Sequence, residues 1–275
     1  MQEANNDRSV FSHYLELLGV KPKRPGYAAL EELVAAHMKR IPFENISKLY
    51  YLKRDGLKNI PSFEQYLSGI EQYGFGGTCY SNNHYLNELL RHLGYQAMLC
   101  GADMSIPDCH LVNMVTVDGR EFLVDAGYAA PFLKPMPRYL DHAHEVRLGR
   151  DRYVLHPKDD NGCSRMDLFR NGELTHGYTA KPIDRRIDFF TSSIQESYRD
   201  DSTFMNSLLL VKLHDDSSTV IYNLSVIRSH GNTHTVQPLK NEDELIETIE
   251  RVFGIPADIV SEAVSMLHGF GNAWN

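Results

Sequence analysis

The stretch that decides the fold reads His110-Leu-Val-Asn-Met-Val-Thr-Val-Asp-Gly-Arg-Glu-Phe-Leu-Val-Asp125. Its two apolar flanks enclose an Asp-Gly pair, which is the strongest short signal for a β-hairpin. A two-residue turn places Val117 opposite Arg120, so paired positions add up to 117 + 120 = 237. His110 then faces Gly127, and Asp125 lies on the diagonal of the same face. This register predicts that an imidazole and a carboxylate meet, whereas a one-residue slip would move Asp125 to the opposite face.

Helical periodicity dominates the residues before this hairpin. Apolar positions recur every three to four residues over 10–18, over 30–38 and from Cys79 onward. Gly19 and Gly94 are typical C-caps, and Pro42 should end the second helix. The first part of the chain is therefore expected to be helical.

Strand patterns continue after the hairpin and then give way to helices. Asn171-Gly172 predicts a second hairpin between residues 166–170 and 173–178. Further strands are expected at 208–213, 220–227 and 233–238, with turns at 215–218 and 230–232. Helices are expected at 242–253, where Asn241 and Glu244 resemble a capping box, and at 257–267. The order predicts an α+β protein without repeats or low-complexity linkers, whose domains pack tightly together.

Composition excludes several classes of protein. The 275 residues include 28 Lys and Arg against 36 Asp and Glu, so the formal charge is −8, and 42% of residues are hydrophobic. These values exclude a disordered chain and a generally basic nucleic-acid binder. No apolar run approaches the ~20 residues of a membrane span, and the start of the chain does not resemble a secretory signal. We expect a cytoplasmic protein that binds neither nucleic acid nor membrane.

The four cysteines are Cys79, Cys100, Cys109 and Cys163. None form a C-x-x-C pair, which argues against a structural zinc site, and most such thiols are inert packing residues. Cys79 differs because it follows Gly74-Phe-Gly-Gly-Thr78 and begins a predicted helix. Free N–H groups and the positive end of the helix dipole favour a thiolate there, and the glycines allow a substrate to approach.

A nucleophilic cysteine needs a base, and the base needs a group that orients it. His110 and Asp125 can fill these roles, although a histidine at a strand edge is commonly solvated and an aspartate beside Gly127 is commonly a turn former. Metal binding is an alternative role for some of these side chains, with Cys109 and His110 or His142 and His144 as the ligands. Neither pair has companion ligands at a recognisable spacing, so we expect no metal.

At these residues the sequence resembles the arylamine N-acetyltransferase family. The matching segments are Arg40–Ser47, Gly76–Tyr80, His110-Leu111 and Leu123–Tyr128. The likeness is good from about residue 13 to 135. It is looser afterwards, where Ser202–Phe204 and Phe253–Ile255 still fit.

The resemblance implies a helical bundle carrying the nucleophile (1–95), a β-barrel carrying the histidine and aspartate (96–190) and an α/β lid (191–275). It implies a thiol-protease-like triad of Cys79, His110 and Asp125, and ping-pong transfer from acetyl-CoA to an arylamine or hydrazine. Aromatic residues that line the family's acceptor pocket match Phe43, Tyr128 and Phe204.

The sequence also departs from the family pattern. Phe75 and Ser81 stand where the family usually has arginine and glutamate, and Tyr128-Ala129 replaces the usual Phe-Gly. These changes bear on substrate preference. The candidates for contacts with the CoA phosphates are Lys134, Arg138 and residues of the lid. A transglutaminase-like or thiol-hydrolase enzyme acting on amides stays open as an alternative, as does an inactive binding module, and the oligomeric state is not determined by the sequence.

Overall fold

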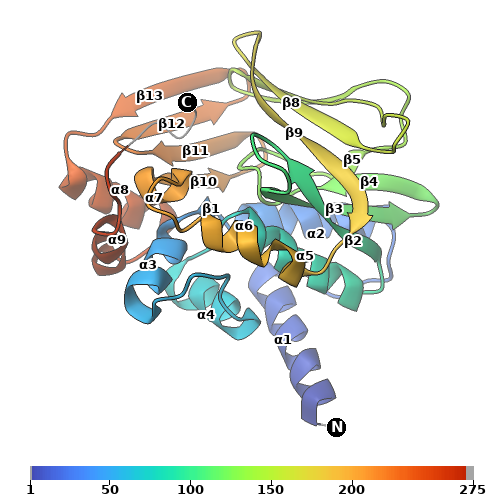
Figure 1. Cartoon of the computed structure of the whole chain (residues 1–275), viewed down its shortest axis with the longest axis horizontal. Helices are drawn as coiled ribbons and strands as arrows, with labels where there is room; N and C mark the ends of the chain where they lie inside the picture. Colours follow the sequence, from blue (N-terminus) through green and yellow to red (C-terminus); the bar gives the residue numbers. More distant parts are fainter. Residues whose placement is uncertain (1, 271–275) are drawn as a thin grey trace.

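The protein, described by a computed structural model over residues 2–270, has three regions in chain order (Figure 1). Met1 and residues 271–275, the ends of the expected first and third domains, lie outside the described residues. A helical region comes first, a sheet that curls into a nearly closed barrel follows, and a mixed α/β region ends the chain. This order is the α+β architecture that the sequence predicts.

The helical region holds the helices α1 (Gln2–Leu18), α2 (Tyr27–Arg40), α3 (Ile46–Asp55), α4 (Phe63–Tyr73) and α5 (Cys79–His92). Helix α2 ends two residues before Pro42, as predicted, because proline disfavours a helical residue before it. Helix α4 begins with a capping box in which Ser62 and Gln65 satisfy each other's backbone N–H groups. Helix α5 begins at Cys79 and precedes Gly94, whose φ is +88°.

The barrel sheet has the strand order β5-β4-β3-β2-β9-β8-β7-β6. Its strands are β2 (Gln96–Asp103), β3 (His110–Val117), β4 (Arg120–Val124), β5 (Met136–Pro137), β6 (His144–Leu148), β7 (Asp151–Leu155), β8 (Ser164–Arg170) and β9 (Glu173–Asp184). Strands β3 and β4 pair Val117 with Arg120 and Asn113 with Val124, which confirms the predicted register. The hairpin at Asn171-Gly172, between β8 and β9, is also confirmed.

The third region holds η1 (Ile187–Phe190), α6 (Thr191–Glu196), α7 (Thr203–Asn206), β10 (Leu209–Leu213), β11 (Ser217–Tyr222), β12 (Ser225–His230), β13 (Thr233–Pro238), α8 (Glu242–Phe253) and α9 (Ala257–Val264). The expected single strand at 220–227 is wrong, because β11 and β12 are separated there by a tight turn. Asn223 makes that turn with a φ of +48°, a left-handed conformation that asparagine tolerates better than most residues. The turn expected at 215–218 is shorter, since β11 already begins at Ser217, and α9 ends before the expected residue 267.

Strand β1 (Phe43–Glu44) joins the first region to the third. Its two residues pair with Val211 and Leu210 of β10, so the five-stranded sheet has the order β1-β10-β11-β12-β13. The expected division into residues 1–95, 96–190 and 191–275 places β1 and β10 in different domains, although these strands pair in one sheet. The division therefore stays a proposal.

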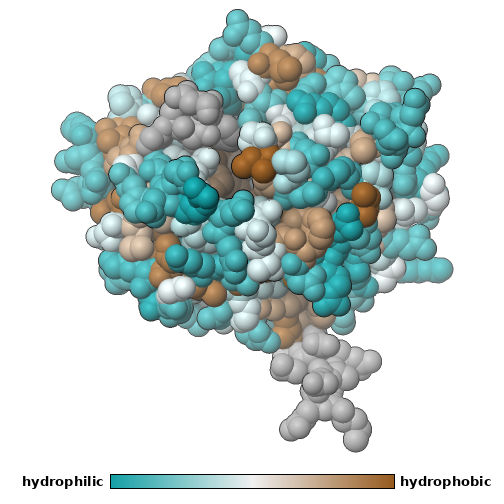
Figure 2. Space-filling model, in the orientation of Figure 1, coloured by the Kyte–Doolittle hydropathy of each residue, from teal (hydrophilic) through white to brown (hydrophobic). Residues whose placement is uncertain are grey.

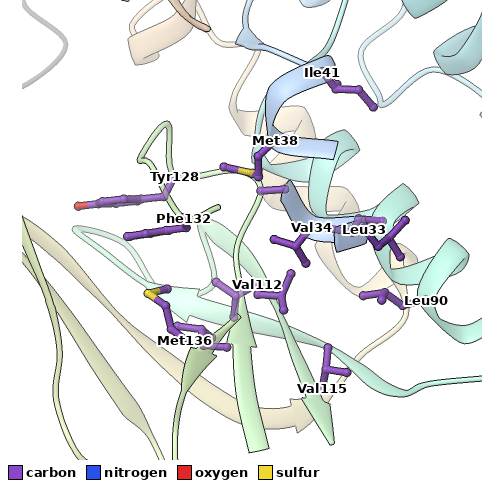
Figure 3. Packing of buried hydrophobic residues seen from close by; sticks show 14 of the residues in the cluster. Leu33, Val34, Met38, Ile41, Leu90, Val112, Val115, Tyr128, Phe132 and Met136 are labelled. Atoms are coloured by element: carbon purple, nitrogen blue, oxygen red, sulfur yellow. The ribbon is translucent and has the colours of Figure 1, made fainter. Parts of the chain in front are cut away.

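The barrel packs against α2 and α5 through a buried apolar layer (Figure 3). Val34 of α2 points toward Val112 of β3, and Leu33 of α2 lies toward α5, which carries Leu90. Burying a side chain of this size stabilises the fold by about 1.5–3 kcal/mol. The packing fixes β3, and therefore His110 at its start, relative to the helix that carries Cys79.

The surface shown in Figure 2 is mostly hydrophilic, with small separate apolar patches. Over residues 2–270, no helix has the length and apolar character needed to cross a membrane.

Candidate active site

The loop before Cys79 is fixed to strand β1. The Glu44 N–H donates to the Gly77 carbonyl oxygen at 3.1 Å, and the Gly77 N–H donates to the Pro42 carbonyl oxygen at 3.4 Å. A Cβ at Gly76 would lie 1.9 Å from that Pro42 oxygen, and one at Gly77 would lie 2.0 Å from the Ser81 Oγ. Gly76 therefore requires glycine, because the backbone oxygen of Pro42 cannot move aside, whereas a side chain at Gly77 would displace the Ser81 hydroxyl.

The buried carboxyl group of Glu44 also holds this loop. Its Oε1 accepts from the Gly76 N–H at 3.0 Å, and its Oε2 accepts from the Ser47 N–H at 2.8 Å. Burial raises the pKa of Glu44, although these hydrogen bonds oppose that shift. One side chain thus connects the start of α3 to the loop that presents Cys79.

Cys79 is the first residue of α5 and is 8% exposed. Thr78 is the N-cap, yet its side chain makes no capping hydrogen bond. The uncapped N–H groups and the helix dipole favour negative charge on the Cys79 sulfur. This position at the start of the helix is the one that the sequence predicts.

His110 and Asp125 meet as the hairpin register predicts. The His110 Nε2 lies 2.9 Å from the Asp125 Oδ2, and each residue is 1% exposed. The other oxygen of Asp125 accepts from the Asn83 Nδ2 at 3.0 Å and from the Gly127 N–H at 2.8 Å. Since Nε2 faces the carboxylate, the other ring nitrogen of His110 is left for Cys79.

The pair is held in its charged form. Burial alone would lower the pKa of His110, but the charge and hydrogen bond of Asp125, helped by Cys79, raise it to about 10. Burial likewise opposes ionisation of Asp125, yet His110, Asn83 and the Gly127 N–H lower its pKa overall. A charged imidazolium, paired with the Asp125 carboxylate and next to Cys79, is therefore favoured at neutral pH.

Two residues that the sequence analysis missed support this arrangement. Asn83 lies four residues after Cys79, on the same face of α5, and is fully buried. Its Oδ1 accepts from the Ala126 N–H at 2.9 Å while its Nδ2 donates to Asp125. The signal available in the sequence was an asparagine one helical turn after the candidate nucleophile. Gly127 is the second residue, and only its three-dimensional neighbours show its importance.

A methyl group at Gly127 would collide with the nucleophile. Its Cβ would lie 2.4 Å from the Cys79 Cα and 2.7 Å from the Cys79 Cβ. We expect Gly127→Ala to lower the free energy of unfolding by about 1–3 kcal/mol and to slow acetyl transfer at least tenfold, as ~1 Å shifts do in active sites. Urea titration and single-turnover kinetics measure both effects. Gly26→Ala is the control, since nothing lies within 4 Å of its Cβ; wild-type behaviour of Gly127→Ala would contradict the prediction.

Of the three predicted acceptor-pocket residues, Phe43 and Tyr128 lie next to residues of this centre, and Phe204 contacts Phe43. Phe43 follows Pro42 next to the glycine loop, and its ring centroid is 5.7 Å from that of Phe204. Tyr128 follows Gly127, and its ring is 5.8 Å from the His110 ring. Figure 3 shows the Tyr128 ring parallel to that of Phe132.

Two of the departures from the family pattern, Phe75 and Ser81, are buried. Phe75 packs its ring edge-on against Tyr50 and Tyr51, so an aromatic cluster occupies the place of a charged side chain. Ser81 is 5% exposed, and its Oγ donates to the Thr78 carbonyl oxygen at 3.4 Å. The structure accommodates both residues without a buried unpaired charge at either position.

The two residues named as candidates for CoA phosphate contacts differ in availability. Lys134 is exposed and pairs with Glu31 at 3.0 Å. Arg138 is 1% exposed, and its Nε and Nη2 donate to Ser164 and to the Gly162 carbonyl oxygen. Arg138 is therefore held inside the barrel by structural hydrogen bonds, and its burial argues against a contact with phosphate.

Metal ligation has no geometric support within residues 2–270, where no group of three His, Cys, Asp or Glu side chains is arranged to hold an ion. His142 pairs instead with Asp141 at 2.8 Å. The expectation of a metal-free site stays a prediction.

A cavity of about 960 Å³ lies elsewhere, between the edge strands β5 and β6. Its wall includes Val117, at the opposite end of β3 from His110. Seven residues of strand at about 3.4 Å each separate the two ends by roughly 24 Å. This cavity is therefore remote from the reacting sulfur.

A family model described as N-acetyltransferase matches residues 27–261. The chain belongs to the arylamine N-acetyltransferase family. The arylamine N-acetyltransferase of Mycolicibacterium smegmatis is 27% identical over 256 residues, which cover 88% of this chain and 90% of that protein. Human arylamine N-acetyltransferase 1 is 32% identical over 172 residues, 57% of this chain and 55% of that one.

Solved structures of arylamine N-acetyltransferases share the fold. The Salmonella typhimurium enzyme superposes with a TM-score of 0.78 at 17% identity, and covers 94% of this chain and 98% of its own. The Mycobacterium marinum enzyme in complex with CoA gives 0.78 at 20% identity, with the same coverage. These comparisons confirm the predicted membership of the family, the predicted fold class and the predicted acyltransferase activity.

Proposed function

We propose that this N-acetyltransferase moves an acetyl group from acetyl-CoA to an arylamine or hydrazine through a thioester on Cys79. The observation that carries the proposal is the buried His110–Asp125 pair at 2.9 Å, placed beside a cysteine at a helix N-terminus. This arrangement supplies a nucleophile, a proton carrier and an orienting carboxylate.

In the first half-reaction the Cys79 thiolate attacks the acetyl carbonyl carbon of acetyl-CoA. The carbon–sulfur bond to CoA breaks, and His110 gives its proton to the departing CoA sulfur. One thioester replaces another, so this exchange needs little driving force. Backbone N–H groups at the start of α5 are suited to bind the oxyanion that forms on the way.

In the second half-reaction a neutral amine attacks the thioester carbon. Neutral His110 takes the amine proton as the tetrahedral intermediate collapses, and Cys79 leaves as the thiolate. Arylamines and hydrazines are weak bases that are largely unprotonated at pH 7, so their lone pair is available. Asp125 stabilises the imidazolium that this step regenerates.

The aromatic residues Phe43, Tyr128 and Phe204 form the proposed acceptor site. Their rings offer apolar faces against which an aryl ring stacks favourably. The Tyr128 hydroxyl lies 2.6 Å from the His176 Nδ1, which fixes its direction. The burial of Phe43 and Tyr128 supports a site that keeps water from the thioester.

Intact mass spectrometry tests the covalent intermediate. Mixing the protein with acetyl-CoA should add one acetyl group, located on the peptide that contains Cys79, and should release one equivalent of CoA. Adding an arylamine should then remove the acetyl group and yield the acetylated amine. Absence of the adduct, together with turnover of a glutamine-containing peptide, would support the transglutaminase-like alternative instead.

We also infer a cytoplasmic location. All four cysteines are free, as expected of a reducing compartment. The formal charge of −8 supports small-molecule substrates over nucleic acid as partners.

A further inference from the structure

The cavity of about 960 Å³ at the seam of the barrel has no part in the mechanism above. It lies between β5 and β6, the two edge strands of the eight-stranded sheet. All five residues of β6 line it, and helix α2 contributes Glu31 and Ala35 to the same wall. Its volume is that of a cavity for a small organic ligand, and it is about 24 Å of strand away from His110.

Three aromatic side chains form a row along this cavity. The ring centroid of Phe122 lies 5.0 Å from that of Tyr27 and 5.6 Å from that of Tyr139. Tyr27 is 37% exposed and Tyr139 is 42% exposed, although both are large apolar side chains. Aromatic surface left open in a hollow is typical of a binding site, and a planar ring would stack or pack edge-on against it.

A positive charge stands at one end of the row. The Arg120 guanidinium lies 5.3 Å from the centre of the Tyr139 ring, a cation–π geometry. Glu121, its neighbour in the chain, pairs with Lys158 and Arg138 instead. The residues that the structure describes include no carboxylate oxygen within 4 Å of the Arg120 guanidinium, so its hydrogen-bonding edge can receive an anion.

The other cationic side chains of the wall already have acidic partners. Lys134 pairs with Glu31 at 3.0 Å, and Arg147 pairs with Glu145 at 2.7 Å. These pairs leave Arg120 as the lysine or arginine of the described wall that is able to bind an incoming carboxylate without breaking an existing ion pair.

The remaining acidic residues of the wall belong to turns. Asp215 and Asp216, between β10 and β11, pair with Lys39 and His230. Asp118 is in the turn between β3 and β4, two residues before Arg120 in the chain. Its charge would oppose an anion at Arg120, which provides a test of opposite sign.

We propose that this cavity is a second ligand site, which binds a small aromatic carboxylic acid. The aromatic ring packs against Phe122 and Tyr139, and the carboxylate accepts hydrogen bonds from the Arg120 guanidinium. The planar fork of a guanidinium matches the two oxygens of a carboxylate, and such charge-assisted pairs are among the stronger hydrogen bonds in proteins. The inference does not depend on the proposed function, because the site shares no residue with the catalytic centre.

Isothermal titration calorimetry with 2-naphthoate tests the site. This probe has an aromatic ring and a carboxylate but no amine that could accept an acetyl group. It should bind in a 1:1 ratio, and 2-naphthamide, which has the same ring without the charge, should bind at least about tenfold more weakly. Equal affinity for the two probes, or no binding of 2-naphthoate, would overturn the proposal.

Substitution of Arg120 tests the contact with the carboxylate. Arg120→Gln should weaken 2-naphthoate binding about tenfold and leave 2-naphthamide binding within a factor of about two. Asp118→Asn should strengthen 2-naphthoate binding, because it removes the opposing charge. Weaker binding after both substitutions would contradict the electrostatic argument.

Arg185→Gln is the matched control for Arg120→Gln. The Arg185 guanidinium also stands over an exposed aromatic ring, 4.3 Å from the centre of Phe189, but neither residue lines the cavity. This variant should bind 2-naphthoate like the wild type. A loss equal to that of Arg120→Gln would show that the cavity is not responsible.

Filling the cavity tests its location. Ala35 is a half-buried residue of α2 in the cavity wall, so Ala35→Phe should place a ring inside and weaken both probes at least about tenfold. Thermal unfolding shows whether the variant is folded, and Ala35→Leu carries the same prediction if the larger residue is not tolerated. Unchanged 2-naphthoate binding in the folded filled variant would place the probe elsewhere and overturn the inference.

Discussion

Replacing Cys79 by alanine should reduce acetyl transfer from acetyl-CoA to an arylamine by about a thousandfold or more. The thioester cannot form without the sulfur, and the remaining His110–Asp125 pair can only assist a direct attack that the site is not shaped for. A coupled assay for CoA release, together with the mass of the protein, measures both halves of the loss.

Cys163→Ala is a suitable control for this experiment. Cys163 is a free, partly buried thiol that begins no helix, and it should keep full activity. Thermal unfolding should be nearly unchanged in both variants, because each removes one sulfur atom. Substantial acetyl transfer by Cys79→Ala would refute the proposed intermediate.

Asp125→Asn should lower the rate of acetyl-enzyme formation by about 10²–10⁴ at neutral pH. The amide has nearly the shape of the carboxylate but carries no charge, and its NH₂ group would face the His110 Nε2. That nitrogen would then have to accept a hydrogen bond instead of donating one, which requires the other imidazole tautomer. Burial would lower the pKa of His110 once the neighbouring charge is gone, so the imidazolium would be lost at neutral pH.

The chain contains a matched control pair for this change. His156 Nε2 lies 2.9 Å from the Asp167 Oδ2, the same distance as in the buried pair, but the His156 side chain is 41% exposed against 2% for His110. Asp167→Asn should therefore leave acetyl-enzyme formation within a factor of about two, as expected of a partly solvated ion pair. Equal effects of the two substitutions would show that general loss of charge, not the site geometry, is responsible.

The same pair should make stability depend on pH. The pKa of His110 is raised in the folded state, so its stabilising contribution is complete below the unfolded value near 6.5 and disappears as pH rises through about 10. The wild-type free energy of unfolding should accordingly fall between pH 7 and pH 10. Urea titrations of Asp125→Asn should show a flatter profile over this interval.

The hairpin shows how much of the site can be predicted from local sequence. Asp118-Gly119 fixes a two-residue turn, and the turn fixes every pairing up to Asn113 with Val124. Because the side-chain period of a strand is two, that register also fixes which residues share a face with His110. The proximity of His110 to Asp125 therefore follows from the strand register alone. The glycine loop before Cys79 similarly identifies the helix that presents the thiol.

Other parts of the fold depend on contacts that local sequence does not report. Strand β1 is only two residues long and exists because β10 pairs with it. Gly127 is required by the nearness of Cys79, which is 48 residues away in the sequence (127 − 79). The turn between β11 and β12 lacks glycine and proline, and only the tolerance of Asn223 for positive φ allows it. The first two of these features are set by tertiary structure, so no pattern of nearby residues predicts them, and the third depends on a single asparagine that strand patterning does not register.

The short strand β1 has a consequence for how the enzyme is made. It contacts the glycine loop on one side and β10 on the other, and Phe43 pairs with Val211. A nascent chain on the ribosome therefore cannot complete the support of its nucleophile until residues past 211 have emerged. Pairings of such long sequence separation form late in folding. The reactive thiol would then be assembled only in a nearly finished polypeptide, which limits unwanted acylation during translation.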